Sequence, residues 1–481
     1  MIALGNLLHR FNVDSQWTAL EAAVWHSSAQ VYALETTTVR LDSTTSYGYH
    51  QVAEQGLMQH GHSKDHRPDL PQLKLMAALA EPAGQWIASD VYPGQRADEG
   101  LYIPLYQRVR SILGRTGLLY IGDCKLVVLA TRAQIAAGGD YYLTRLPRNL
   151  FSAAQWTHWE AQRDAAAQLT LFWQEGELVG GGCEWWEETL SAAVAGRTVT
   201  WQERLQWVYS PSHAARQAQA LEQRLQQATT ALQALTPAPG RGKRAIRDEE
   251  TLHARSTAIL EQYQVSGLLR PQWEVVEHRH TRYVGRGRGS ATRATHEIVQ
   301  RHYRISRVER LTPAISAAHN GLGWQLQVTS APPERLTLAE ATTAYRGEWH
   351  LELDFHRVKE RPVGLSPLFV WRDDQIRGLT RLLTLALRLL TRIETQVAQG
   401  LTAADESLPG LYEGQPQRTT TQPTAGRLLR ALGRAEITLT EIHSPTHMEW
   451  YLTPLPPWLT QILTYLKLPP DLYESLTDNS P

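Results

Sequence analysis

The sequence predicts an α/β protein built from more than one domain, and three observations lead to this prediction. The chain has 481 residues, too many for one ordinary hydrophobic core and enough for about two to four units. Extended and helical patterns alternate over residues 1–150, as in α/β folds. Residues 151–340 instead contain a long periodic helix and a basic stretch rich in β-forming residues. We therefore expect an α/β unit followed by a domain of different construction.

The α/β unit begins with three extended stretches. Residues 31–50 are rich in Thr, Val and Tyr and predict a strand through Asp42; a second stretch is expected to end in "HGHSKDHRPDL", and the third is "GQWIASDVYPG". The helical pattern "LYIPLYQRVRSIL" ends at Gly114. The apolar run Leu118–Ile121 then predicts a strand buried on both faces, with Asp123 just after it. A helix and the strand "DYYLTRLP" complete the unit.

Residues 151–340 are predicted to combine helices with a β-hairpin. Ala and Leu recur at steps of four and three between Ser212 and Pro237, which is the spacing of a heptad seam. We expect this helix to pack against an antiparallel helix of the same chain, with a dimer contact as the alternative. The stretch from Trp273 to Arg310 predicts strands around a glycine-arginine hairpin tip.

Residues 341–400 are predicted to form two helices. The first includes "AYRGEWHLELDFHRVKERP", which has no proline before Pro362 and predicts an unbroken helix. Tyr345, Glu352 and Lys359 are seven residues apart, so they would share one helical face. The apolar positions beside that face are expected to be buried; they are Leu351, Phe355 and Val358. Residues 401–481 predict a linker and a small region with helix, strand, strand and helix.

Composition excludes several classes of protein. The net charge of zero argues against a uniformly basic nucleic-acid-binding protein, but residues 241–310 hold 15 Lys and Arg against 8 Asp and Glu. No apolar run approaches the ~20 residues of a membrane span, and no secretory signal is seen, so we expect a cytoplasmic protein. The only cysteines, Cys124 and Cys183, provide neither a disulfide framework nor a zinc site.

Three acids are candidates for a metal site: Asp42, Asp123 and Glu352. Neighbouring strands lie ~4.8 Å apart, so acids from adjacent strands and a packing helix can converge. Converging carboxylates repel one another unless a cation neutralises them. Their oxygen atoms suit Mg²⁺ or Mn²⁺, and two such ions can bind the attacking and leaving oxygens of phosphoryl transfer.

Around these acids the sequence resembles the DDE transposases of bacterial insertion sequences, in the subgroup with a β-rich insertion before the Glu. The signature of that subgroup is Tyr, two residues, Arg, three residues, Glu, six residues and Lys. Tyr345, Glu352 and Lys359 match it, while the Arg position holds Glu348 and Arg346 lies two residues earlier. The flanks "VRLDSTTSYGYH", "HGHSKDHRPDLPQ" and "YIGDCKLVVLATRAQIAAGGDYYL" resemble the family as well.

The resemblance implies a ribonuclease H-like core, a mixed sheet flanked by helices, that a large α+β insertion domain interrupts. Residues 1–150 and 341–400 would form the core, 151–340 the insertion, and 401–481 a linker with a small C-terminal region. The implied activity is cutting of insertion-sequence ends and joining to target DNA, with two Mg²⁺ or Mn²⁺ ions per site. Double-stranded DNA would be the partner, bound by a homodimer at the bacterial nucleoid.

The same resemblance implies roles for individual residues. Asp42, Asp123 and Glu352 would be the catalytic metal ligands. Contacts to the DNA backbone near the scissile phosphate would come from Tyr345, Arg346 and Lys359.

Weaker candidates for DNA binding lie in and beside the basic stretch. Trp273 and Trp324 are candidates for stacking on a flipped base, worth ~1–3 kcal/mol per base, with core packing as the alternative. Arg286 and Arg288 could enter a minor groove or lie on a hairpin tip.

Two other functions remain open at this stage. Only 41 residues precede Asp42, whereas the resembled family carries a longer helical region there, so a catalytically inactive, N-terminally truncated DNA-binding remnant is one alternative. A general metal-dependent nuclease is the other. A separate metal site is not expected in the histidine-rich stretch after Asp42, because its spacing fits no standard zinc pattern; that stretch contains His60, His62, Asp65, His66 and Asp69.

Overall fold

Two compact units make up the chain in the computed structural model. The structure describes residues 2–166, 169–174, 177–187, 189–237, 245–284, 294–415, 417–444, 447–469, 471–473 and 475. Unit 1 comprises Met1–Ser152, Glu184–Gln206 and Gln327–Pro481, and unit 2 comprises Ala153–Cys183 and Trp207–Leu326. The chain passes between the units after Ser152 and then within three strands: β7 (Glu177–Trp186), β10 (Arg204–Tyr209) and β13 (Trp324–Thr329).

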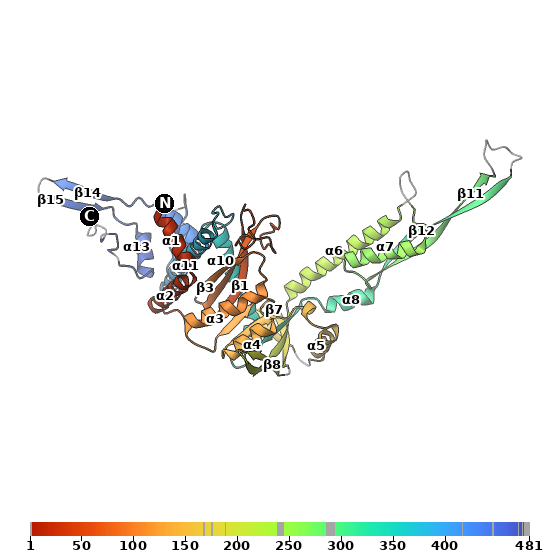
Figure 1. The fold of residues 1–481 in the computed structure, drawn as a ribbon, viewed down its shortest axis with the longest axis horizontal. Coiled ribbons are helices and arrows are strands. Elements are labelled where there is room, and N and C mark those ends of the chain that lie inside the picture. The colour runs from red at the N-terminus through yellow and green to blue at the C-terminus, as the bar shows by residue number, and fades with distance from the viewer. Residues whose placement is uncertain are drawn as a thin grey trace. The chain divides into compact units, whose positions relative to one another are not determined.

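A large mixed sheet forms the centre of unit 1 (Figure 1). Its strands before the first crossing are β1 (Thr36–Tyr47), β2 (Gln72–Pro82), β3 (Gln85–Pro93), β4 (Leu119–Gly122) and β5 (Tyr141–Arg145). Their spatial order is β3-β2-β1-β4-β5, and β13 pairs antiparallel with β5. β2 is antiparallel to β1 and β3, whereas β4 is parallel to β1 and β5 is parallel to β4. The predicted α/β class is thus confirmed.

Helices and short hairpins surround this sheet. The helices of unit 1 are α1 (Ile2–Asn12), α2 (Asp14–Tyr32), α3 (Tyr102–Leu113), α4 (Leu129–Ala137), α9 (Leu338–Arg346), α10 (Trp349–Lys359), α11 (Asp373–Ala404), α12 (Ala425–Arg434) and α13 (Pro457–Tyr465), with 3₁₀ turns at Asp98–Leu101 and Arg148–Leu150. The hairpins are β8 (Leu190–Val194) with β9 (Arg197–Trp201), and β14 (Leu439–Ser444) with β15 (His447–Leu452). The predicted helix, strand, strand and helix of the C-terminal region are confirmed.

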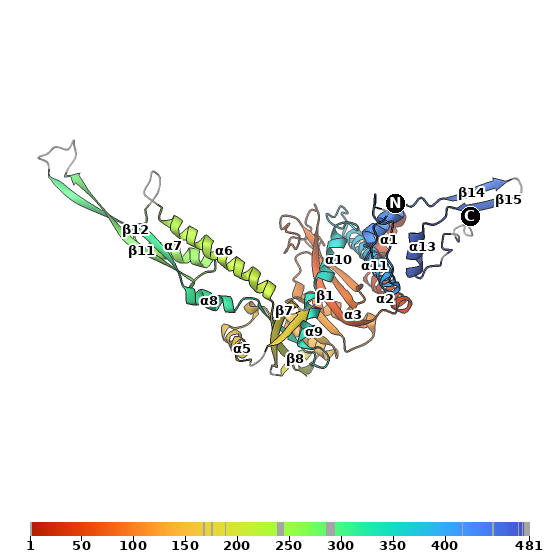
Figure 2. The same cartoon turned by 180° about the vertical axis from the view of Figure 1, so that it is seen from behind.

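The apolar face of α10 builds the core over one face of the sheet. Leu351, Phe355 and Val358 are buried, as predicted, and pack in one cluster with residues of β2, β3 and α11. In that cluster the Phe355 ring meets the ring of Trp86 edge to face, with the ring centroids 5.7 Å apart. Figure 2 shows α10 next to β1. This packing fixes the position of every side chain that α10 projects toward β1.

Two predictions about elements of unit 1 are wrong. The second extended stretch is not a strand through "HGHSKDHRPDL": residues 48–71 form turns and a loop, and the strand is β2, directly after them. The helix predicted to continue through residue 361 is broken at Gly347 and Glu348, so Tyr345 lies on α9 whereas Glu352 and Lys359 lie on α10.

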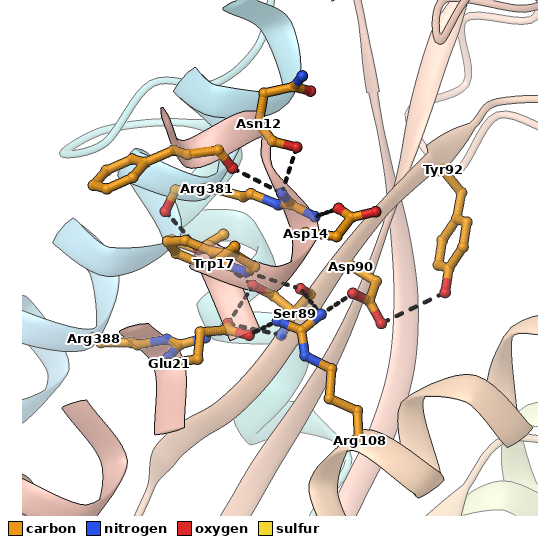
Figure 3. A network of polar contacts seen from close by, with 12 residues as sticks. Asn12, Asp14, Trp17, Glu21, Ser89, Asp90, Tyr92, Arg108, Arg381 and Arg388 are labelled. Carbon is orange, nitrogen blue, oxygen red and sulfur yellow. Dashed lines mark hydrogen bonds and ion pairs between the residues drawn. The ribbon is translucent and has the colours of Figure 1, made fainter. Parts of the chain in front are cut away.

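A buried polar network attaches α2 to the sheet and to α11 (Figure 3). The carboxylate of Glu21 is fully buried and pairs with both Arg108 and Arg388. It also accepts hydrogen bonds from the backbone N–H and the hydroxyl of Ser89, each at 3.0 Å. Such a cluster needs every member, because a single buried charge without partners costs several kcal/mol.

Unit 2 contains a long β-hairpin packed against helices (Figure 1). Its elements are α5 (Ala153–Ala165), β6 (Thr170–Gln174), α6 (Pro211–Leu235), α7 (Glu249–Gln262), β11 (Leu269–Tyr283), β12 (Thr295–Arg310) and α8 (Thr312–Asn320), with parts of β7, β10 and β13. The heptad positions Leu221, Leu225 and Leu232 are buried against α7 and the hairpin, which confirms the expected partner helix within the chain. The segment from Ser210 to Gly323 includes α6, α7, the hairpin and α8. Its two ends are joined where the Ser210 N–H donates to the carbonyl of Gly323 at 3.0 Å.

Two further findings concern the whole described chain. The predicted hairpin is confirmed as β11 and β12, while Arg286 and Arg288 at its tip lie outside the described residues. Within the described ranges, we find no helix with the length and apolar character needed to cross a membrane.

Candidate functional site

Asp42 and Asp123 lie close together at neighbouring parallel strands. The register of β1 and β4 pairs Leu41 with Gly122, so Asp42 is the next residue of β1 and Asp123 is the first residue after β4. Each aspartate is partly buried. Asp123 contributes to a raised pKa of Asp42, as expected when two carboxylates share one region.

Asp123 is held in place by two donors. The hydroxyl of Tyr102 donates to Oδ1 at 2.6 Å, and the backbone N–H of Lys125 donates to the same oxygen at 2.9 Å. A Cβ on Gly122 would lie 2.9 Å from the Tyr102 ring, so a glycine here lets that ring approach. Burial and the charge of Asp123 raise the pKa of Tyr102 far above its usual range, and the phenol therefore stays protonated as a donor.

Asp42 is paired with a lysine from the loop between β1 and β2. Lys64 Nζ lies 3.2 Å from Asp42 Oδ1, and the backbone N–H of Ser43 donates to the same oxygen at 2.6 Å. Burial raises the pKa of Asp42 to about 6, with Asp123 adding to the effect and Lys64 opposing it. The ammonium of Lys64 is therefore the partner that favours the ionised form of Asp42.

Glu352 faces the same cavity as Asp42. This cavity, called the carboxylate pocket below, is lined by Asp42, Ser43, Thr44, Tyr47, Lys64, Asp65, Glu352, Phe355, His356, Lys359, Glu360 and Ser366. Glu352 is exposed in the first turn of α10, and Lys359 lies two turns later on the same face, as predicted. Asp123 lies beside Asp42 and is not among the lining residues.

Glu348 is a fourth acid near the aspartates that the sequence did not mark as functional. Burial raises its pKa, and the charges of Asp42, Glu352 and Asp123 raise it further. The residue lies at the break between α9 and α10 and precedes Glu352 by one helical turn. The sequence signal that could have identified Glu348 is its position, where the signature of the resembled family has an arginine.

Arg40 connects the strand of Asp42 to the helix break. Its guanidinium is buried, binds both carboxylate oxygens of Glu81 at 2.9 and 3.0 Å, and donates to the carbonyl of Ala344 at 2.6 Å. A Cβ on Gly347 would lie 2.8 Å from Arg40 Nη2. The glycine thus allows the arginine to reach the end of α9, and the start of α10 is positioned relative to β1.

The three residues expected at the DNA backbone occupy different surroundings. Tyr345 packs in an apolar cluster that includes Ile121 and Leu143, and burial raises its pKa, with Glu348 and Asp123 adding to the rise. Arg346 is exposed in the last turn of α9. Lys359 lines the carboxylate pocket, where its Nζ lies 2.6 Å from Asp65 Oδ1.

The two candidate stacking tryptophans belong to unit 2, where both have partners. Trp273 packs on the α6 and α7 cluster and donates to Glu249 at 3.2 Å. Trp324 contacts the rings of Trp207 and Tyr209. Both side chains are partly buried, and base stacking by either tryptophan stays a prediction.

Exposed aromatic residues near the carboxylate pocket were missed by the sequence reasoning. Phe369 and Trp371 are 75% and 68% exposed, in the loop that follows Ser366 of the pocket. The Trp371 ring lies 5.2 Å from the ring of His50, and Val370 O is 2.7 Å from His50 Nε2. No hydrophobic periodicity identifies such residues, because they lie in a loop.

The carboxylate oxygens of the three predicted ligands suit a divalent ion that prefers oxygen, although these side chains are not close enough together to enclose one. Asp42, Asp123 and Glu352 offer carboxylate oxygens alone, which is the ligand type that Mg²⁺ and Mn²⁺ prefer. Over the described ranges, no three His, Cys, Asp or Glu side chains converge closely enough to hold a metal ion. The cation that pairs with Asp42 is instead the ammonium of Lys64.

Comparisons with known proteins give no family for this chain. A scan against models of protein families finds no match, and a search among curated proteins finds none either. Any functional conclusion must therefore come from the carboxylate pocket and the residues around it.

Proposed function

We propose that this protein is a DDE-type transposase, a metal-dependent DNA nuclease and strand transferase. The observation that carries the proposal is the place of Asp42 on β1 and of Asp123 directly after the parallel neighbour strand β4, with Glu352 projecting from α10 into the pocket of Asp42. Three carboxylates from these elements can supply oxygen ligands to the two metal ions that act in phosphoryl transfer.

The fold of unit 1 supports a ribonuclease H-like core for this proposal. The strand order β3-β2-β1-β4-β5 has an antiparallel first half and a parallel second half, and the acids lie at the centre, on and just after β1 and β4. Residues 1–150 and 341–400 would supply the catalytic side chains, and residues 151–340 the insertion.

Asp42, Asp123 and Glu352 would bind two Mg²⁺ or Mn²⁺ ions, which when bound activate the nucleophile and stabilise the leaving oxygen. The chain's own groups prepare the site. Tyr102 holds Asp123 in one orientation, and Arg40 fixes the start of α10 relative to β1. Lys359 places a positive charge at the pocket rim, where it can contact a phosphate of double-stranded DNA as a point charge.

Cleavage of a labelled duplex tests the proposal. The duplex carries the DNA that flanks the gene, and the reaction contains Mg²⁺ or Mn²⁺. We expect cutting at the element boundary by the wild-type chain and a loss of at least about a hundredfold with Glu352→Gln, as for removal of a group that acts on the transition state. Glu413→Gln is the matched control, because that side chain is 86% exposed and pairs only loosely with Arg434 at 3.4 Å.

The outcomes separate the proposal from its competitors. Binding without cutting by the wild-type chain would favour an inactive DNA-binding remnant. Cutting of unrelated DNA at the same rate would favour a general nuclease. Cutting that survives Glu352→Gln would refute the assignment of the third carboxylate.

A further inference from the structure

The loop between β1 and β2 folds back over the strand that carries Asp42. The backbone N–H of Lys64 donates to the hydroxyl oxygen of Thr45 at 3.0 Å. The Lys64 ammonium then donates to Asp42 Oδ1 at 3.2 Å and to the carbonyl of Ser43 at 2.5 Å. Because the ammonium is held by both a side chain and the backbone of β1, it has a defined place on the carboxylate.

The next residue of the loop holds the second lysine of the pocket. Asp65 Oδ1 lies 2.6 Å from Lys359 Nζ on α10, and Asp65 Oδ2 accepts from the Thr45 hydroxyl at 3.3 Å. One loop thus places a cation on β1 and a carboxylate against α10. Both pocket lysines are bound to carboxylates, so each must leave its carboxylate before it contacts a phosphate.

The charges that line the carboxylate pocket explain why the Lys64–Asp42 and Lys359–Asp65 pairs suit the protein without a bound metal ion. The lining contains four carboxylates and two ammonium groups: Asp42, Asp65, Glu352 and Glu360, with Lys64 and Lys359. A phosphodiester would be repelled by the excess negative charge. A divalent cation would neutralise that excess, and it would repel the ammonium beside Asp42, since the two like charges would be a few ångströms apart.

We propose that Lys64 is the counter-ion of Asp42 in the metal-free pocket, and that a divalent cation displaces its ammonium toward a phosphodiester of bound DNA. The first half concerns this chain and the cation alone. The second half rests on the proposed function. Lys64 is thereby a positioning residue, since its ammonium neutralises part of the charge of Asp42 until the cation enters.

Metal binding without DNA tests the first half. Mn²⁺ is titrated into the full chain at pH 8 and followed by calorimetry, with Lys64→Met, Lys64→Arg and, as control, Lys467→Met. Lys467 is exposed, and its Nζ donates to the carbonyl of Val31 at 3.3 Å. Lys64→Met should bind Mn²⁺ about tenfold more tightly, because a neighbouring charge at this range is worth at least that factor. Lys64→Arg and the control should match the wild type; unchanged or weaker binding by Lys64→Met overturns the counter-ion role.

A second variant keeps the test valid if Lys64→Met fails to fold. Thr45→Val removes the hydroxyl that holds both Lys64 and Asp65 while leaving every charge of the pocket in place. The loop should then hold the ammonium less firmly, so Mn²⁺ binding should tighten by a smaller factor. No change in this variant contradicts the proposal.

DNA binding tests the second half. A phosphorothioate duplex keeps its charges and resists cutting, and its affinity is measured by fluorescence anisotropy over a range of salt concentrations. Without metal, wild type and Lys64→Met should have the same salt dependence. With Mn²⁺, Lys64→Met should lose about one unit of slope, as expected for one phosphate contact. Equal slopes with Mn²⁺ overturn the displacement, whereas absence of any DNA binding refutes the proposed function and leaves the Mn²⁺ result to decide the counter-ion role.

Discussion

Replacing Asp42 with Asn should stabilise the metal-free protein, and the gain should depend on pH. Burial and the nearby Asp123 raise the pKa of Asp42 from an ordinary value of 3.8 to about 6. The folded chain therefore binds this proton more tightly than the unfolded chain does. Ionisation of Asp42 costs folding free energy, fully at pH values above about 6 and not at all well below 3.8.

The size of the effect follows from the shift of about 2 pKa units, each worth about 1.4 kcal/mol. Asn has nearly the same shape as the protonated carboxyl and no charge. Asp42→Asn should thus raise the free energy of unfolding by about 3 kcal/mol at pH 8 and by about 1 kcal/mol at pH 4.5. The side chain is 13% exposed, so screening by solvent reduces these values only in part.

Hydrogen exchange of the β1 amides, followed by mass spectrometry, measures this stability in unit 1 alone. The protein is kept in a metal chelator, and rates are corrected for the intrinsic pH dependence of exchange. Adding Mg²⁺ should then stabilise the wild type by mass action and leave Asp42→Asn nearly unchanged. A variant no more stable than the wild type at pH 8, or a gain of equal size at both pH values, would refute the reasoning.

Three further changes have defined outcomes. Glu21→Gln leaves Arg108 and Arg388 without a buried countercharge, so thermal unfolding should show a loss of about 3–5 kcal/mol; a change no larger than that of Glu413→Gln would contradict the network's role. Glu348→Gln removes repulsion with Asp42, Asp123 and Glu352, so its metal-free melting temperature should rise while cutting persists; a loss of cutting as deep as that of Glu352→Gln would make Glu348 a required ligand. Trp371→Ala should weaken binding of single-stranded DNA, in an anisotropy titration, by the ~1–3 kcal/mol of one stacked base, whereas equal affinities would assign the exposed ring another role.

Local patterns predicted the elements that carry the aspartates. The branched and aromatic residues of β1 and the apolar run of β4 have high strand propensity, and Gly114 ends α3 with a positive φ of 64°. β2 was missed because "QLKLMAALA" is buried at every position and rich in Ala, Leu and Met. Such a run shows no alternation, and its residues favour a helix when considered alone.

The site itself was predictable only in part. The spacing of Glu352 and Lys359 placed both on one face of α10, because that relation is local. The break at Gly347 was missed, although a glycine inside a helical pattern weakens the helix; the contact of Arg40 with the end of α9 comes from a residue far away in the sequence. The pairing of Lys64 with Asp42 likewise arises from a loop that folds back over β1, and neither periodicity nor propensity encodes such a contact.

The hydrogen bond between Ser210 and Gly323 has a consequence for which part of the chain can be replaced. More than a hundred residues lie between Ser210 and Gly323, and a backbone hydrogen bond joins these two residues. The strands leading to that point, β10 and β13, are neighbours in the sheet order. A short turn could therefore replace everything between them without extending either strand. Exchange of this segment for another one, at Ser210 and Gly323, would leave β10 and β13 side by side in the sheet.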